Sequence, residues 1–208
     1  MVTRLHEGCG GHLALDFVNV VDRTRDVAPP ERLLRYDDLL RWCVEACALG
    51  EPCAEGLRSE AAVDPRGAAD ALQRAIDLRE AIFEVFDGIA NAEPAREDVL
   101  IRINAELARA LPALRVTTTD DGFRWEWTED EPALDAPLWP IVKAAAELLV
   151  SPDRERVRQC ASARCLWLFL DKTKNRGRRW CDMRTCGNRE KVRQHRLRRS
   201  DRTDASAN

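Results

Sequence analysis

The chain has 208 residues, 45% of them hydrophobic and 33% charged, so it can build a core as one large domain or as a medium domain with a small module. No apolar run approaches the roughly 18 residues of a membrane span, and the N-terminal sequence MVTRLHEGCGG has no apolar secretion segment. We therefore expect a cytoplasmic protein with no membrane partner. In that compartment the eight cysteines stay reduced and favour metal binding over disulfides.

The N-terminal part is predicted to be mostly helical. Residues 13–22, LALDFVNVVD, are apolar and partly alternating, which predicts a strand. Apolar residues at helical spacing then predict helices over 36–50, 65–91 and 96–111. Gly50 is expected to end the first of these helices.

The composition then changes to that of a β-hairpin. Residues 114–129 alternate around Asp121-Gly122, which is a strong turn signal. Three aromatic side chains should share one face of the second strand: Phe123, Trp125 and Trp127. A proline-containing loop leads to a helix predicted over 141–150.

The charge is distributed unevenly along the chain. Residues 154–202 contain 17 Lys and Arg against 5 Asp and Glu, whereas residues 1–153 contain 16 against 30. An acidic body with a strongly basic end predicts that the end contacts a polyanion. We expect a first domain over 1–150, a basic module over 151–202 and a disordered tail over 203–208.

The basic module contains two cysteine pairs with the spacing Cys160-x4-Cys165-x15-Cys181-x4-Cys186. Zinc prefers four soft ligands in a tetrahedron, and two close pairs separated by a hairpin-sized gap provide them. His195 is a less favoured alternative ligand. About fifty residues bury little core, so one structural Zn²⁺ per chain is expected to hold the module together.

The module is predicted to fold as a small zinc finger. Residues 166–171 and 178–180 predict the two strands of a hairpin, and a basic helix follows the last cysteine. This order is typical of a treble-clef or zinc-ribbon finger. The predicted fold class is therefore α+β: a mostly helical N-terminal domain with a small antiparallel sheet, followed by a C-terminal four-cysteine zinc finger.

The sequence resembles one known family of bacterial proteins. The run RRWCDMRTCGNREKVRQHR and the segment FLDKTKN resemble the CGNR zinc finger, whose motif is spelled by residues 186–189. Upstream, HLALDFVNVVDR and LLRWCVEACAL resemble the ABATE domain that precedes this finger. The resemblance covers residues 10–199 and implies a stress-induced transcription regulator with a ligand-sensing N-terminal domain.

The cations of the module are candidates for contact with duplex DNA. They lie in the predicted hairpin turn and in the predicted helix: Lys172, Lys174, Arg176, Arg178, Arg179, Arg189, Lys191, Arg193 and Arg196. Arg189, Arg193 and Arg196 would share one helical face and could bind phosphates or guanine. A local role is also open, in which Asn188 bonds the backbone and Arg189 pairs with Asp171 or stacks on Trp180. The basic end could instead dock on an acidic protein surface.

Three polar residues of the N-terminal part are weaker candidates for binding an unknown small-molecule effector. Asp16 could be a ligand, a catalytic carboxylate or a cap, and the family resemblance adds Asn19. Arg79 interrupts an apolar stripe and could bind an anion or pair with Glu80 or Asp77.

Other residues of this part leave further alternatives open. A second metal site could form from His6, Cys9 and His12. Cys43 and Cys47, one helical turn apart, are expected to be small core residues, with a redox pair as the alternative.

The sequence therefore predicts a DNA-binding transcription regulator, which could be a homodimer. The alternative is a metabolite-binding protein or an enzyme whose finger serves structure or assembly. No nucleophile motif, phosphate-cradling loop or catalytic metal pattern supports an enzyme.

Overall fold

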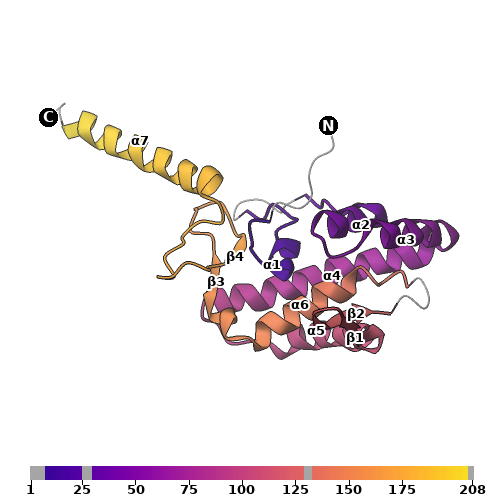
Figure 1. The fold of residues 1–208 in the computed structure, drawn as a ribbon. Coiled ribbons are helices and arrows are strands. Elements are labelled where there is room, and N and C mark those ends of the chain that lie inside the picture. The colour runs from indigo at the N-terminus through magenta and orange to yellow at the C-terminus, as the bar shows by residue number, and fades with distance from the viewer. Residues whose placement is uncertain (1–7, 25–29, 129–132, 206–208) are drawn as a thin grey trace.

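The computed structural model describes residues 8–24, 30–128 and 133–205, and it shows a helical body from which a hairpin and a long helix project (Figure 1). The helical elements are α1 (Leu13–Val18), α2 (Tyr36–Glu45), α3 (Glu51–Val63), α4 (Pro65–Ala90), α5 (Glu97–Ala110), η1 (Leu111–Ala113), α6 (Leu138–Val150), η2 (Pro152–Arg156), η3 (Met183–Gly187) and α7 (Asn188–Ala205). The strands form two antiparallel pairs, β1 (Leu114–Thr119) with β2 (Gly122–Trp127) and β3 (Val157–Gln159) with β4 (Leu168–Leu170). The α+β fold class is thereby confirmed.

Helix α4 is the centre of the body. Pro65 stands at its start, and the side chain of Asp64 caps it by accepting a hydrogen bond from the backbone N–H of Gly67. Its apolar stripe is buried and contacts the other body helices, α2 and α3 on one side and α5 on the other (Figure 1). The helices expected over 65–91 and 96–111 are confirmed as α4 and α5.

The first element is a helix, so the strand predicted over residues 13–22 was wrong. The backbone N–H groups of Asp16 and Asn19 donate to the carbonyls of His12 and Leu15, which is helical bonding. Apolar residues on several sides of this single short helix are buried, among them Ala14, Leu15, Phe17 and Val18. A fully buried run of this length has no periodicity that separates helix from strand.

Gly50 does not end the helix predicted over residues 36–50. That helix, α2, ends at Glu45, and Gly50 is the residue that precedes α3, which the sequence analysis missed. Cys47 therefore lies outside the helix, exposed and with a positive φ of 55°, whereas Cys43 is fully buried. The two cysteines do not share an apolar face.

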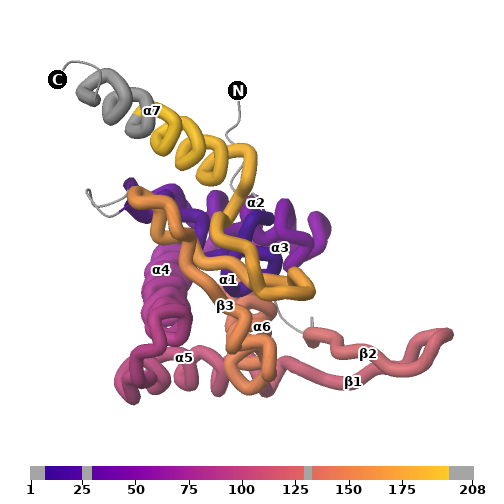
Figure 2. Tube along the Cα trace, turned by 90° about the vertical axis from the view of Figure 1, so that its left-hand side faces the viewer, coloured from indigo at the N-terminus to yellow at the C-terminus, as the bar shows by residue number. Residues whose placement is uncertain are grey.

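The hairpin over 114–129 is confirmed as β1 and β2, and the later helix begins at Leu138 rather than 141. The base of the hairpin is anchored to α6, where the rings of Trp127 and Trp139 lie 5.7 Å apart. Its tip extends away from the helices (Figure 2).

The hairpin of the finger differs from the predicted one. Strand β4 pairs with β3, with Val157 opposite Leu170 and Gln159 opposite Leu168, and residues 178–180 form no strand. The first cysteine pair thus lies in the connection within the hairpin. Segment 178–180 still lies beside it, since the N–H of Ala161 donates to the carbonyl of Arg179 over 2.8 Å.

The hairpin β3–β4 belongs to two cores at once. Val157, Leu168 and Leu170 are part of the main hydrophobic core of the body. Phe169 points to the other face, where it packs with Trp167 and the cysteines in a smaller cluster. The composition places a boundary near residue 150, but the apolar packing continues across it.

The free edge of β4 is covered by the N-terminal segment. The N–H of Leu166 donates to the carbonyl of Arg23, and that of Leu170 to the carbonyl of Gly10, over 3.1 and 2.8 Å. Only glycine fits at position 10, because a Cβ would lie 2.9 Å from the backbone of Leu15. Between these two bonds, the side chain of Asn19 bonds the backbone of Leu168, so every second residue from 166 to 170 is bonded to segment 10–23.

Helix α7 leaves the body and packs mainly against η3 (Figure 1). It confirms the predicted basic helix but extends to Ala205, so residues 203–205, expected in a disordered tail, are helical. None of the helices that the structure describes combines the length and the apolar character that a membrane span requires.

Candidate zinc centre and nucleic-acid interface

The four cysteines of the finger meet at one point. Their sulfur atoms all lie within 4.8 Å of one another. The Sγ of Cys181 lies 3.8 Å from that of Cys165 and 3.6 Å from that of Cys186. Four thiolates at about 2.3 Å from a tetrahedral zinc ion would be about 3.8 Å apart. The predicted ligand set, with Cys160 as its fourth member, therefore fits one zinc ion.

Short local structures position each pair. The connection between β3 and β4 is closed by the N–H of Cys160 donating to the carbonyl of Trp167, and by the N–H of Cys165 donating to that of Ser162. The second pair is set by η3, a turn of π-helix. There the side chain of Asp182 accepts from the N–H of Thr185, and its carbonyl accepts from the N–H of Gly187. All four positions are filled by protein, so the site is structural.

The crowding of the thiols favours a cation at their centre. Without a metal, hydrogen bonds from the thiols of Cys165 and Cys181 lower the pKa of Cys160. The pKa of Cys165 and that of Cys181 are raised, chiefly because each thiol donates to its ionised neighbour. A bound zinc ion would lower the pKa of all four thiols together, since it binds the four cysteines as thiolates.

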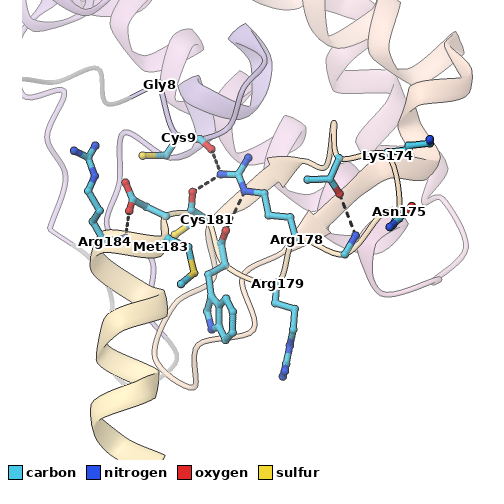
Figure 3. Close-up of a pocket in the computed structure, with 13 residues that line it drawn as sticks. Gly8, Cys9, Lys174, Asn175, Arg178, Arg179, Cys181, Met183 and Arg184 are labelled. Atoms are coloured by element: carbon cyan, nitrogen blue, oxygen red, sulfur yellow. Dashed lines mark hydrogen bonds between the residues drawn. The ribbon is translucent and has the colours of Figure 1, made fainter.

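Arg178 supports the site from beside it. Its guanidinium donates to the backbone carbonyls of Cys9, Trp180 and Cys181 (Figure 3). It also lies over the ring of Phe169, 4.4 Å from the ring centroid. Arg178 was predicted to contact DNA, but its guanidinium faces the protein.

The buried Asp171 holds the turn that follows β4, residues 171–178. Its carboxylate accepts from the N–H and the hydroxyl of Thr173 and from the N–H of Arg178. The expected pairing of Asp171 with Arg189 is therefore absent from the contacts that the described residues make. Trp180 is stacked by Arg179, 5.1 Å from the ring centroid, rather than by Arg189. Asn188 does bond the backbone, by donating to the carbonyl of Arg184 over 3.2 Å.

A basic groove runs between the first cysteine turn and α7. It has a volume of about 870 Å³, and Glu190 is the one acid among its described lining residues. Five arginines line it: Arg164, Arg184, Arg189, Arg193 and Arg196. Glu190 holds Arg193 through contacts of 2.7 and 3.1 Å, which aligns this guanidinium along the helix.

Two arginines of this groove, Arg164 and Arg184, were not predicted from the sequence. Arg164 directly precedes the ligand Cys165, and Arg184 lies two residues before Cys186. Their closeness to ligands was the available signal, because a metal-bound backbone fixes the positions of its neighbours.

A second basic surface lies beyond Arg184. The open pocket of Figure 3, also about 870 Å³, has Lys174 and Arg184 at opposite ends, with Arg179 between them. The other predicted cations, Lys172, Arg176 and Lys191, are exposed. Since Arg184 lines both cavities, the basic surface continues from the turn after β4 to α7.

The three candidate effector residues are occupied by protein partners. Asp16 accepts from the N–H of Gly10 over 2.7 Å, and Asn19 bonds the backbone of β4. Arg79 is buried and forms a two-pronged ion pair with Glu31, with a further contact to Glu80. Burial lowers the pKa of Arg79, but the bonds to the carboxylates outweigh it and the net pKa is raised.

The second metal site that His6, Cys9 and His12 could form stays a prediction. His6 lies outside the described residues. Cys9 packs against the finger cluster, and His12 precedes α1, where burial lowers its pKa. Among the described residues, the four finger cysteines are the group placed to hold a metal, and His195 is not part of it.

Comparison with known families matches both parts of the chain. Residues 11–152 match ABATE, described as "Putative stress-induced transcription regulator". Residues 156–199 match the CGNR zinc finger. No curated protein matches the chain.

Proposed function

The chain belongs to the ABATE family and ends in a CGNR zinc finger, and from this we propose that it regulates transcription by binding duplex DNA through the finger and α7. The observation that carries the proposal is the arginine-lined groove, whose described lining residues include five arginines and a single carboxylate, that of Glu190. Arginine binds phosphate oxygens with two parallel hydrogen bonds, so such a groove suits a nucleic-acid backbone.

The shape of the finger supports duplex rather than single-stranded DNA. Helix α7 projects from the body, and the described side chains of its first part, apart from Glu190, are exposed (Figure 1). An isolated helix of this kind fits the width of a major groove. The backbone of one strand would then pass through the arginine groove, and the turn with Lys172, Lys174 and Arg176 would reach a neighbouring phosphate.

The N-terminal body would act as the part that senses an effector. The edge of β4 gives it a direct route to the finger, since segment 10–23 bonds that edge at alternate residues. The polar groups of three candidate residues already bond protein partners: Asp16, Asn19 and Arg79. These residues would therefore stabilise the body or transmit the effect of binding to the finger, and would not bind the effector themselves.

Fluorescence anisotropy with labelled duplex DNA over a salt series tests the proposal. Six phosphate contacts would give a log–log slope of about −5. Replacing Arg193 and Arg196 by alanine should flatten that slope by up to about 2. The matched control replaces Arg66 and Arg109, which are exposed on α4 and α5, and removes the same charge away from the groove.

Two outcomes would contradict the proposal. One is the absence of binding at low salt by zinc-loaded, folded protein. The other is an equal change of slope in the groove variant and its control. Either result would favour the alternative, a metabolite-binding protein or enzyme whose finger serves assembly.

A further inference from the structure

The hairpin β1–β2 has an apolar face that the described residues leave largely uncovered. Val116 is paired with Trp125, and Thr118 with Phe123, so these side chains lie on the same face. Phe123 is 78%, Trp125 58% and Val116 56% exposed. The ammonium of Lys143 lies over the ring of Trp125, 5.6 Å from its centroid.

This arrangement is incomplete as an isolated unit. A two-stranded hairpin is marginally stable in water unless further strands extend the sheet or a helix packs against its apolar face. Here the contact between Trp127 and Trp139 anchors the base, while the tip extends away from the body (Figure 2). A partner that extends the sheet would place its own side chains beside Trp125 and Phe123 and bury part of their surface.

The outer edge of β2 is ready to pair with another strand. The turn is closed by the pair Thr119 and Gly122, so alternate residues of β2 direct their N–H and C=O groups to the outer edge. These residues are Phe123, Trp125 and Trp127. Within the described part of the chain, their outward backbone groups have no hydrogen-bond partner.

We propose that two copies of this chain pair through β2, antiparallel and centred on Trp125, to form a four-stranded sheet across a two-fold axis. Charge complementarity identifies the second copy as the partner. In this register Arg124 lies opposite the partner's Glu126, and Glu126 opposite the partner's Arg124. These pairs fall at positions where antiparallel strands are closest, with Cα atoms about 4.5 Å apart.

The same register gathers the apolar side chains. Trp125 meets the partner's Trp125, and Phe123 meets the partner's Trp127, on the face opposite the charges. Arg124 and Glu126 already contact each other within one hairpin, at 2.7 Å. The pairing would place each Glu126 between Arg115 of its own hairpin, at 3.8 Å, and Arg124 of the other copy. The inference goes beyond DNA binding and does not depend on it.

Charge exchange at these two positions provides the test, with mass measured by sedimentation equilibrium on the full-length, zinc-loaded protein. Wild-type protein should show a concentration-dependent dimer. Arg124→Glu alone places four acids at the axis and Glu126→Arg alone places four bases, so each variant should dissociate at least tenfold more readily. Mixing the two variants should restore the dimer, because every opposed pair is then of opposite charge.

A disulfide cross-link tests the proposed strand register without the charge variants, in case one of them folds poorly. Trp125→Cys should form a disulfide-linked dimer under mild oxidation, because this position opposes itself across the axis. Val116→Cys, on the other strand of the hairpin, should not.

If the wild-type protein is a monomer at all concentrations, the proposal is wrong, and the apolar face of the hairpin β1–β2 would then bind a different protein. A dimer insensitive to both charge variants, or a mixture that stays monomeric, would also overturn it.

Discussion

The side-chain amide of Asn19 forms both of its backbone hydrogen bonds with Leu168, donating to the carbonyl over 2.8 Å and accepting from the N–H over 3.1 Å. Asn19 thus takes the place of a neighbouring strand on the free edge of β4. The two residues are 149 positions apart in sequence and both are buried. This contact joins the ABATE body to the zinc finger.

Replacing Asn19 by alanine should lower the free energy of unfolding by about 2–3 kcal/mol, since two buried backbone groups of Leu168 would lose their partners. Asn91 offers a matched control because its amide makes one exposed bond, to the carbonyl of Asp87. Asn91→Ala should cost less than about 1 kcal/mol. Urea unfolding of the zinc-loaded proteins measures both, and equal losses would contradict the role of Asn19.

A chain that ends at Val150 should lose cooperative unfolding. The composition predicts that residues 1–150 fold alone, but the core predicts the reverse, because Val157, Leu168 and Leu170 would leave it. Their loss exposes apolar surface and leaves a cavity in the packing. Near-ultraviolet circular dichroism and a thermal melt measure the outcome. A sharp melt with native tertiary signals would show that the body closes without the hairpin.

Protein purified without added metal should contain about one zinc per chain by elemental analysis. Cys186→Ser should lose the metal together with the order of η3 and the start of α7, since the thiolate set would be incomplete. Cys43→Ser is the control, because Cys43 is buried in the body away from the site. Full zinc retention in a Cys160→Ser/Cys186→Ser double variant would exclude this ligand set.

The ion pair of Glu31 with Arg79 should stabilise the protein at neutral pH and be lost in acid. Burial alone raises the pKa of Glu31, but the hydrogen bonds from Arg79 and from the N–H of Leu33 outweigh it, so the net pKa is lowered. A carboxyl group whose pKa is lowered by folding stabilises the folded state fully when the pH is above its pKa in the unfolded chain, about 4.3. This stabilisation disappears as the pH falls through the pKa of the folded state.

Urea unfolding between about pH 6 and about pH 3 tests this effect. Wild type should lose stability more steeply toward low pH than Glu31→Gln. Glu93→Gln, at an exposed position, should follow wild type. Zinc loss in acid affects all three proteins alike, so the difference between the curves isolates the ion pair. Parallel curves for Glu31→Gln and wild type would contradict the assignment.

The parts of the fold that the sequence predicted are those with local signals. Helix α4 has a long apolar stripe with a proline start, and β1–β2 has alternating residues on both sides of an Asp-Gly signal. The zinc ligands were predicted by spacing, because two close pairs of cysteines separated by a hairpin-sized gap provide the four soft ligands that zinc prefers.

The parts that were mispredicted depend on distant contacts. Strand β3 has only the residues VRQ, and it is a strand because Val157 enters the body core and Cys160 follows it. Arg178 illustrates a different limit. Counting charges placed it with the DNA-contacting cations, but a count gives no direction, and its guanidinium points to three carbonyls.

The shared strand β4 has a consequence for engineering and for evolution. The finger cannot be exchanged as a separate unit at the boundary between the two family matches. One face of its hairpin β3–β4 is part of the hydrophobic core of the N-terminal body. A functional chimera between two members of the family would have to transplant segment 10–23 along with residues 156–199. Substitutions at Gly10 and Asn19 in one lineage should then be accompanied by changes in β4, so these two distant stretches of the gene are expected to vary together.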